Sequence, residues 1–360
     1  MPVWLDRGPL GCRLFTTDQQ NRVAAPSKID HPDRDGIELG LLNNMSDSAL
    51  EQTERQILKL LHAASDGLAV RLRLYALPGV PREDWGRKHL SRLYYYGADD
   101  LWNSHLDGLI VTGAEPRTAD LKQEAYWHEL TETLDWADQN TISTVPSCLA
   151  VHAAVLHFDG IDRCSLDEKC FGIFDFSKVS NNPLLTGVPQ RFRMPHSRWN
   201  EIKEAALASC GYEVLTKSAQ HGVDMFIKPK KSLFVFFQGH PEYEAWTLLG
   251  EFRRDIARFL NGERDAYPTM PRAYFDDESA RALNAFRERA MANPHKELMA
   301  TFPTDLLVGK LTEPWHITAV AIYSSWLRYL AAQKAERTRF MRSGAFAPTT
   351  TANQGGLKSG

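Results

Sequence analysis

Two adjoining runs decide the fold: the strand-like Thr141-Ile142-Ser143-Thr144-Val145 and the helix-like Leu149-Ala150-Val151-His152-Ala153-Ala154-Val155-Leu156-His157. The first is apolar and β-branched, as in a buried strand, and the second has helical periodicity. Cys148 lies at the corner between them. A cysteine at a helix N-terminus meets backbone N–H groups and the positive end of the helix dipole, which stabilise a thiolate. The corner therefore predicts that Cys148 is a nucleophile.

Strands and helices alternate on both sides of this corner. Apolar runs at 37–42, 70–77 and 109–111 predict strands, and periodic segments near 121–136, 244–260 and 316–340 predict helices. Alternation at this spacing predicts an α/β fold with a doubly wound, mostly parallel sheet and helices on both faces. Reactive groups collect at the carboxyl ends of such strands.

A second motif, Gln238-Gly239-His240-Pro241-Glu242, follows the apolar run at 233–237. A histidine two residues before a carboxylate suits a base that is held by its orienting group, so we expect a Cys148, His240 and Glu242 triad. His152, one helical turn beyond Cys148, is a rival base, but no carboxylate follows it nearby, and we interpret it as a supporting or core histidine. The alternative is that Cys148 is a small core residue and that His240 only bonds a loop carbonyl.

The rest of the chain predicts one domain. We expect residues 36–340 to form a single α/β domain, with an irregular insertion at about 158–232 that runs as an antiparallel excursion and carries pocket residues. Residues 1–35 and 341–360 lack periodicity, and we expect both segments to be disordered.

Composition narrows the class of protein. The chain has 360 residues, 43% hydrophobic and 24% charged, with a formal net charge of −3, which offers no footprint for nucleic acid. No apolar stretch is long enough to span a bilayer and no signal peptide is visible, so we expect a cytoplasmic protein. The five cysteines show no metal-binding spacing, so we expect free thiols and no metal.

Several motifs match one known family in order and spacing over roughly 37–275. They are the strand and Cys148, Phe237-Gln238-Gly239-His240-Pro241-Glu242-Tyr243, Glu251-Phe252-Arg253-Arg254-Asp255, Leu106-Asp107-Gly108-Leu109-Ile110-Val111-Thr112-Gly113-Ala114, Ala125-Tyr126-Trp127 and Pro195-His196-Ser197-Arg198. By these motifs the chain resembles the homoserine O-succinyltransferase/O-acetyltransferase family of methionine biosynthesis. Class I glutamine amidotransferases share the flavodoxin-like fold that this resemblance implies. Their usual Gly-x-Cys-x-Gly corner is absent at Pro146-Ser147-Cys148-Leu149-Ala150.

The resemblance implies ping-pong acyl transfer from acyl-coenzyme A, the co-substrate, to the hydroxyl of homoserine, with no bound cofactor and a homodimeric enzyme. Cys148 would carry the acyl group, and the backbone N–H groups of Leu149 and of Gly113 or Ala114 would form the oxyanion hole. Three further positions match substrate contacts of the family: Arg254, which would bind the amino-acid carboxylate, Ser197 and Lys169. For Arg254 the plain alternative is an ion pair with Asp255 or Glu251, and for Lys169 it is a solvated charge cluster.

Two departures from the family pattern concern the acyl donor. The position that distinguishes succinyl from acetyl donors in the family falls on Arg117, whose charge favours a succinyl group. The alternative is that Arg117 only forms an ion pair with Glu115 or Asp120. The family's lysine pair after the first strand is missing from Asn43-Asn44-Met45-Ser46-Asp47-Ser48. Homoserine O-acetyltransferase, a serine O-acyltransferase, a hydrolase resembling the glutamine amidotransferases and a non-catalytic binding module stay open.

Overall fold

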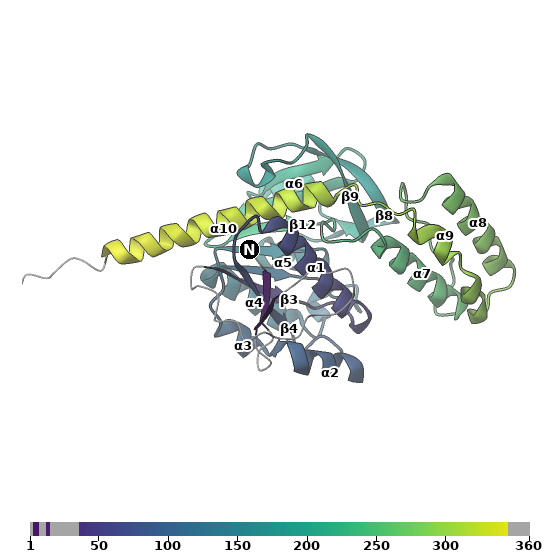
Figure 1. The fold of residues 1–360 in the computed structure, drawn as a ribbon, viewed down its shortest axis with the longest axis horizontal. Coiled ribbons are helices and arrows are strands. Elements are labelled where there is room, and N and C mark those ends of the chain that lie inside the picture. The colour runs from purple at the N-terminus through teal and green to yellow at the C-terminus, as the bar shows by residue number, and fades with distance from the viewer. Residues whose placement is uncertain (1–2, 7–11, 15–35, 345–360) are drawn as a thin grey trace, which may run out of the picture.

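The computed structural model describes residues 3–6, 12–14 and 36–344 (Figure 1). Its strands form one sheet in the order β2-β1-β4-β3-β6-β7-β12-β11-β10-β8-β9. The short strand β5 lies outside this order and pairs with the last two residues of β4. The strands are β1 (Val3–Asp6), β2 (Cys12–Leu14), β3 (Ile37–Leu42), β4 (Val70–Ala76), β5 (Tyr95–Tyr96), β6 (Gly108–Val111), β7 (Ser143–Pro146), β8 (Cys164–Lys178), β9 (Arg191–Glu201), β10 (Glu213–Ser218), β11 (Gly222–Pro229) and β12 (Leu233–Phe237).

The parallel part of this sheet confirms the predicted fold class. Strands β4, β3, β6, β7 and β12 are mutually parallel, and their order corresponds to the 2-1-3-4-5 order of flavodoxin-like folds. The strands alternate their side chains between two cores, because successive residues of a strand point to opposite faces. In β12, for example, Phe234 and Phe236 pack in one core, whereas Val235 and Phe237 pack in the other.

Helices cover both faces of the sheet. One core contains side chains of α1, α7, α8 and α10, and the other contains those of α3, α4, α5 and α6. The α-helices are α1 (Leu50–Ala64), α2 (Asp84–Leu93), α3 (Ala98–Trp102), α4 (Trp127–Asn140), α5 (Leu149–Asp159), α6 (Glu204–Ser209), α7 (Thr247–Leu260), α8 (Asp277–Ala292), α9 (Thr304–Val308) and α10 (His316–Gly344). The short 3₁₀ helices are η2 (Asp47–Ala49), η3 (Leu121–Gln123), η4 (Pro183–Leu185) and η5 (Lys296–Thr301).

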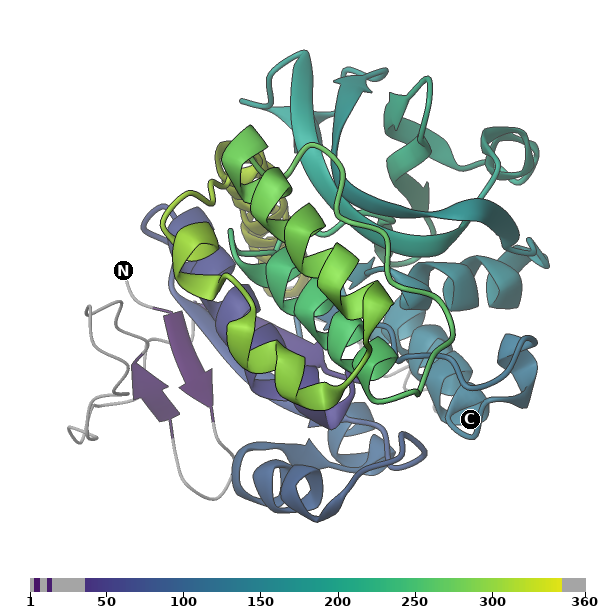
Figure 2. The same ribbon diagram turned by 90° about the vertical axis from the view of Figure 1, so that its right-hand side faces the viewer.

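The antiparallel excursion is present but is not irregular. Strands β8 and β9 form a long antiparallel pair, and β10 and β11 join it to β12. Figure 2 shows these teal strands curving away from the parallel part of the sheet. The polar residues at 164–169 are exposed or half-buried, so the segment does not show the apolar pattern by which buried strands are recognised in a sequence.

The two ends of the chain differ from the expectation in part. Residues 3–6 pair with β4 and residues 12–14 pair with β1, so the expectation of disorder over the whole of 1–35 is wrong at these strands. The expectation of disorder over 341–360 is likewise wrong at 341–344, which belong to the helix His316–Gly344. The rest of both segments lies outside the described residues.

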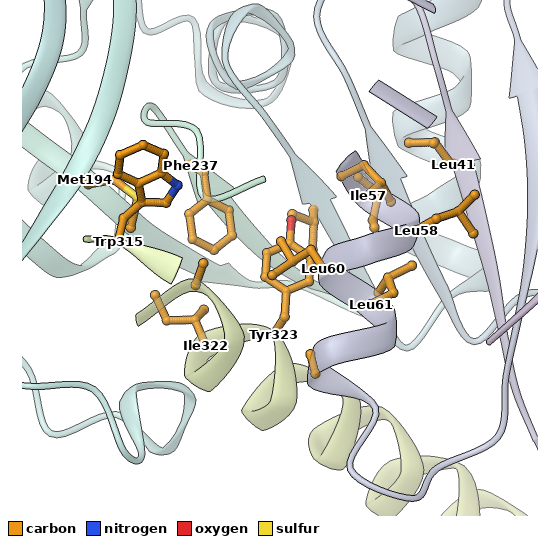
Figure 3. Close-up of a cluster of buried hydrophobic side chains, with 14 of the residues drawn as sticks. Leu41, Ile57, Leu58, Leu60, Leu61, Met194, Phe237, Trp315, Ile322 and Tyr323 are labelled. Atoms are coloured by element: carbon orange, nitrogen blue, oxygen red, sulfur yellow. The ribbon is translucent and has the colours of Figure 1, made fainter. Parts of the chain in front are cut away.

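The long helix α10 supports the sheet from one face. It packs along α1, and its residues Ile322 and Tyr323 reach the core near Phe237, as Figure 3 shows. The Tyr323 ring stacks on the ring of Phe237 at 6.0 Å between centroids. Farther along, α10 runs beyond the body of the molecule (Figure 1).

Candidate active site

The corner that carries Cys148 is a strained turn between β7 and α5. Cys148 has φ 52° and ψ −116°, a conformation that side chains other than glycine rarely adopt and that costs about 1–3 kcal/mol. Neighbouring strands hold the turn in place, because the Ser147 N–H donates to the Val111 carbonyl and the Cys148 N–H donates to the Phe237 carbonyl, each at 2.9 Å. A sharp strand-to-helix turn of this kind presents a nucleophile above the sheet edge, and Cys148 is half-buried there.

The loop after β6 lies directly against the start of α5. A Cβ placed on Gly113 would come within 2.6 Å of the Leu149 Cβ and 2.8 Å of the Leu149 nitrogen. Only a glycine allows this close approach. The two backbone segments that were predicted to donate to an oxyanion therefore lie side by side, next to Cys148.

His240 and Glu242 adopt the arrangement that their spacing predicts. The Nδ1 atom of His240 lies 2.8 Å from the Glu242 Oε1 atom, and both side chains are about nine-tenths buried. Burial lowers the pKa of His240, but the charges of Glu242 and Cys148 and hydrogen bonds to both outweigh burial and raise the pKa well above its usual value. The imidazole thus lies between the carboxylate and the thiol.

A buried pair of polar residues, Asp224 and His196, lies under the His240 loop. The Gly239 N–H donates to the Asp224 Oδ1 atom at 3.1 Å, and a Cβ on Gly239 would come within 2.8 Å of the His196 Nε2 atom. The His240 N–H also donates to the Pro195 carbonyl at 3.0 Å. Sequence reasoning missed this support, although an aspartate inside the apolar run of β11 is a signal of a buried polar contact.

Three side chains from different strands and loops converge on Glu251 of α7. Ser197 Oγ donates to its carboxylate at 2.5 Å and Tyr243 Oη at 2.6 Å, while Lys169 Nζ lies 3.5 Å away. The Tyr243 ring also stacks on the His240 imidazole, with 4.1 Å between centroids. Two predicted substrate-contact residues, Ser197 and Lys169, are therefore next to the base, and Lys169 is not a solvated charge, because its side chain is only 14% exposed.

Arg254 lies on the same helix and is paired with its neighbour. Its Nε atom donates to the Asp255 Oδ1 atom at 3.1 Å, and its side chain stays 40% exposed. Burial lowers the pKa of Arg254, but Asp255, Glu251 and Glu115 together raise it. The Arg258 guanidinium, four residues further along α7, donates to the Glu115 carboxylate at 3.4 Å, so this part of α7 lies against the loop after β6.

Arg117 is exposed on the loop that follows Ala114. Its backbone N–H donates to the Glu124 carboxylate at 2.6 Å, which also accepts from the Thr118 N–H at 2.7 Å. The expected alternative, an ion pair with Glu115 or Asp120, does not occur among the described residues. The backbone of this loop is fixed while the guanidinium stays open to solvent.

A buried arginine holds the segment that lacks the lysine pair. Arg82, whose side chain is 2% exposed, donates to the carbonyls of Asn43 and Met45 and pairs with Asp47. The Asn44 N–H donates to the Thr112 Oγ1 atom at 2.8 Å. This segment is therefore fixed against the end of β6 without a lysine.

His152 is buried in α5, and its Nδ1 atom has no hydrogen-bond partner in the described part of the chain. Burial, with Arg163 and Arg198 nearby, lowers its pKa to about 3. The interactions that raise the pKa of His240 come from Cys148 and Glu242 and not from His152. Of the two histidines, His240 is therefore the one that interacts with the Cys148 thiol.

Residues 3–6, 12–14 and 36–344 contain neither a metal-binding cluster nor a membrane-spanning helix. No group of three His, Cys, Asp or Glu side chains is placed to hold a metal ion. No helix there combines the length and the apolar character that a membrane crossing requires.

Comparisons with known proteins point to one family. The sequence model of the homoserine O-succinyltransferase family matches residues 14–337. The homoserine O-succinyltransferase of Rhodopseudomonas palustris is 47% identical over 86% of this chain and 95% of its own length. The enzyme of that name from Bradyrhizobium japonicum is 45% identical over 88% of this chain and 98% of its own length. A solved glutamine amidotransferase from Thermotoga maritima aligns with 82% of this chain and 98% of its own at 11% identity and a TM-score of 0.43.

Proposed function

From the premise that this chain belongs to the homoserine O-succinyltransferase family, we propose that it transfers a succinyl group from succinyl-coenzyme A to the hydroxyl of homoserine. The observation that carries the proposal is the placement of the Cys148 thiol at the start of α5, next to an imidazole that Glu242 orients. Such a constellation performs nucleophilic acyl transfer.

The first half-reaction forms an acyl-enzyme. The Cys148 thiolate attacks the thioester carbonyl, and the Leu149 and Gly113 or Ala114 N–H groups bind the developing oxyanion. As the bond to the coenzyme A sulfur breaks, the leaving thiolate takes the proton from His240. The raised pKa of His240 supports this step, because the imidazole is protonated while the thiolate attacks.

The second half-reaction transfers the acyl group to the acceptor. Neutral His240 removes the proton of the homoserine hydroxyl as the oxygen attacks the thioester on Cys148, and the Cys148 thiolate leaves. Glu242 holds the imidazole in the required orientation and stabilises the imidazolium. The enzyme returns to its starting state without a net change in protonation.

Acceptor and donor are bound on two sides of the thiol. Arg254, 40% exposed and close to the loop after Ala114, binds the acceptor carboxylate, while Ser197 and Lys169 place Glu251 beside the base. On the donor side, exposed Arg117 attracts the negative end of the succinyl group. The proposal includes a cytoplasmic, homodimeric enzyme that uses acyl-coenzyme A as co-substrate and needs no bound cofactor.

Intact-protein mass spectrometry tests the covalent step. We expect the chain to gain the mass of one succinyl group on incubation with succinyl-coenzyme A alone and to lose it when homoserine is added. Cys148→Ala abolishes the adduct, whereas Cys164→Ala, which removes another half-buried thiol, leaves it unchanged. An adduct that persists in Cys148→Ala contradicts the assignment.

The same assay separates the other candidate functions. An acetyl adduct formed in preference to a succinyl adduct indicates the acetyltransferase, and discharge by serine but not homoserine indicates a serine acyltransferase. A glutaminase activity without any acyl adduct indicates a hydrolase, and the absence of both activities indicates a binding module.

A further inference from the structure

Three buried polar atoms near the nucleophile have no partner that the fold provides. The Oη atom of Tyr126, the Nδ1 atom of His152 and the Nη1 atom of Arg163 are all buried and unbonded in the described part of the chain. Tyr126 and His152 are each about 95% buried. Arg163 lies within electrostatic range of both. Native proteins seldom leave such groups unsatisfied, so a cluster of three indicates a missing ligand.

The charge around this cluster is also uncompensated. Arg163 donates to the Ala119 carbonyl at 2.7 Å, and the buried Arg198 donates to the carbonyls of Asn200 and His221 and to the His196 Nδ1 atom. Neither guanidinium forms an ion pair within the described residues, although Asp224 lies behind His196. Arg198 is buried and Arg163 is half-buried. A cation that is removed from water without a counter-charge is costly, so this region favours an anion.

The remaining carboxylate near the cluster is already engaged. Glu124 influences Tyr126, but its Oε1 atom accepts bonds from the Arg117 N–H and from the N–H and hydroxyl of Thr118. Glu124 therefore holds the loop and does not neutralise Arg163.

Two residues of the cluster, His152 and Tyr126, lie near the start of α5. His152 follows Cys148 by four residues in α5, which is about one helical turn, or ~5.4 Å along the axis. Tyr126 lines a hollow whose other walls include Gly113, Leu149, Ala150 and Ala153. The alanines leave space beside the oxyanion donors, and a succinyl chain extends a similar distance from the sulfur that carries it.

We propose that Tyr126, His152 and Arg163 form a buried subsite that binds the free carboxylate at the far end of the donor's acyl group. This inference rests on the proposed function and extends it: exposed Arg117 attracts the donor, whereas the buried subsite holds the acyl group once it is attached to Cys148. A carboxylate would satisfy the Tyr126 hydroxyl and the Arg163 guanidinium directly. Neutral His152 would donate from Nδ1 in the matching tautomer.

The test compares two donors that differ only in the terminal group of the acyl chain, a carboxylate in one and a methyl group in the other. Succinyl-coenzyme A and butyryl-coenzyme A have acyl chains of equal length, but only the first ends in a carboxylate. We expect the ratio of their kcat/KM values to fall about 10-fold in Tyr126→Phe and about 100-fold in Arg163→Gln, because each variant removes a hydrogen bond to a charged group. The matched control is Arg193→Gln, which removes another half-buried guanidinium that donates to a backbone carbonyl, and it should leave the ratio unchanged.

Each outcome decides the proposal. The subsite is overturned if the ratio stays constant in Tyr126→Phe and Arg163→Gln, whether the rates themselves are unchanged or fall equally with both donors. Tyr126→Phe decides alone if Arg163→Gln does not fold, because the loss of an unpartnered hydroxyl leaves no new group unpaired. Acylation of wild-type Cys148 by succinyl-coenzyme A with unchanged ratios refutes only the subsite, whereas absence of acylation by any acyl-coenzyme A refutes the proposed function as well.

Discussion

The proposed nucleophile, Cys148, and its proposed base, His240, are held in different ways. Cys148 is positioned by backbone alone: a positive φ angle, two hydrogen bonds to adjacent strands and the close contact of Gly113 with Leu149. The ring of His240 is positioned by neighbouring side chains. Glu242 holds its ring and Tyr243 stacks on it.

This difference indicates which changes each half tolerates. The nucleophile corner should be sensitive to added atoms, because nothing there can move without breaking the sheet. The base should be sensitive to lost charges and hydrogen bonds, because these define the orientation of its ring. Four predictions test the two statements.

The largest effect is expected at the orienting carboxylate. Glu242→Gln should lower kcat about a thousandfold to ten-thousandfold, because a neutral amide neither stabilises the imidazolium nor fixes its tautomer. It should also lower the pKa of His240, since the Glu242 charge raises that pKa. Steady-state rates across pH, with circular dichroism as a folding control, measure both effects. Turnover close to wild type would exclude Glu242 from the triad.

A single added methyl group tests the nucleophile corner. Gly113→Ala should lower kcat about 100-fold through the oxyanion donors and the free energy of unfolding by about 1–3 kcal/mol, because the new Cβ would overlap Leu149. Gly309→Ala is the control, since its Cβ would meet nothing within 4 Å. Equal behaviour of the two variants would show that the corner is not tightly packed.

The third prediction concerns the exposed charge of Arg117, on the loop after β6. Arg117→Glu should shift the ratio of kcat/KM for succinyl- over acetyl-coenzyme A downward by about 10-fold, because the new carboxylate repels the succinyl group. The effect should shrink in high salt, as expected for an exposed charge. A ratio that does not change would remove Arg117 from donor selection.

The smallest effect is expected in the pH dependence of stability, through His196 under the His240 loop. Burial, only partly offset by Asp224, lowers the pKa of His196 to about 4. The unfolded chain therefore binds a proton at higher pH than the folded one. The full contribution of this group to the free energy of unfolding is present above about pH 6.5. As the pH is lowered from 6.5 to 4, that free energy falls by at most about 1.4 kcal/mol per pH unit. Urea unfolding of wild type and His196→Gln should show a shallower pH dependence in the variant. Parallel curves would contradict the prediction.

The sequence revealed the half of the site that depends on local chain geometry. Cys148 between a β-branched run and a helix, and His240 two residues before Glu242, are short-range patterns, and the parallel strands bring their ends to one edge. It did not reveal Glu251 as the partner of Ser197, Lys169 and Tyr243, because those contacts join residues up to 82 positions apart. The antiparallel excursion was predicted, but the bounds of β8 and β9 within it were not, because their polar faces obscure the alternating pattern of a strand.

The site is braced by residues that are synthesised late, at the start of helix α10. The Trp315 indole, just before this helix, donates to the Tyr243 carbonyl at 2.8 Å, and Tyr323 stacks on Phe237. The ribosome adds Tyr243, which stacks on His240, 72 residues before it adds Trp315, whose indole braces Tyr243. A nascent chain that ends before residue 315 would therefore contain every proposed catalytic residue and still lack this brace.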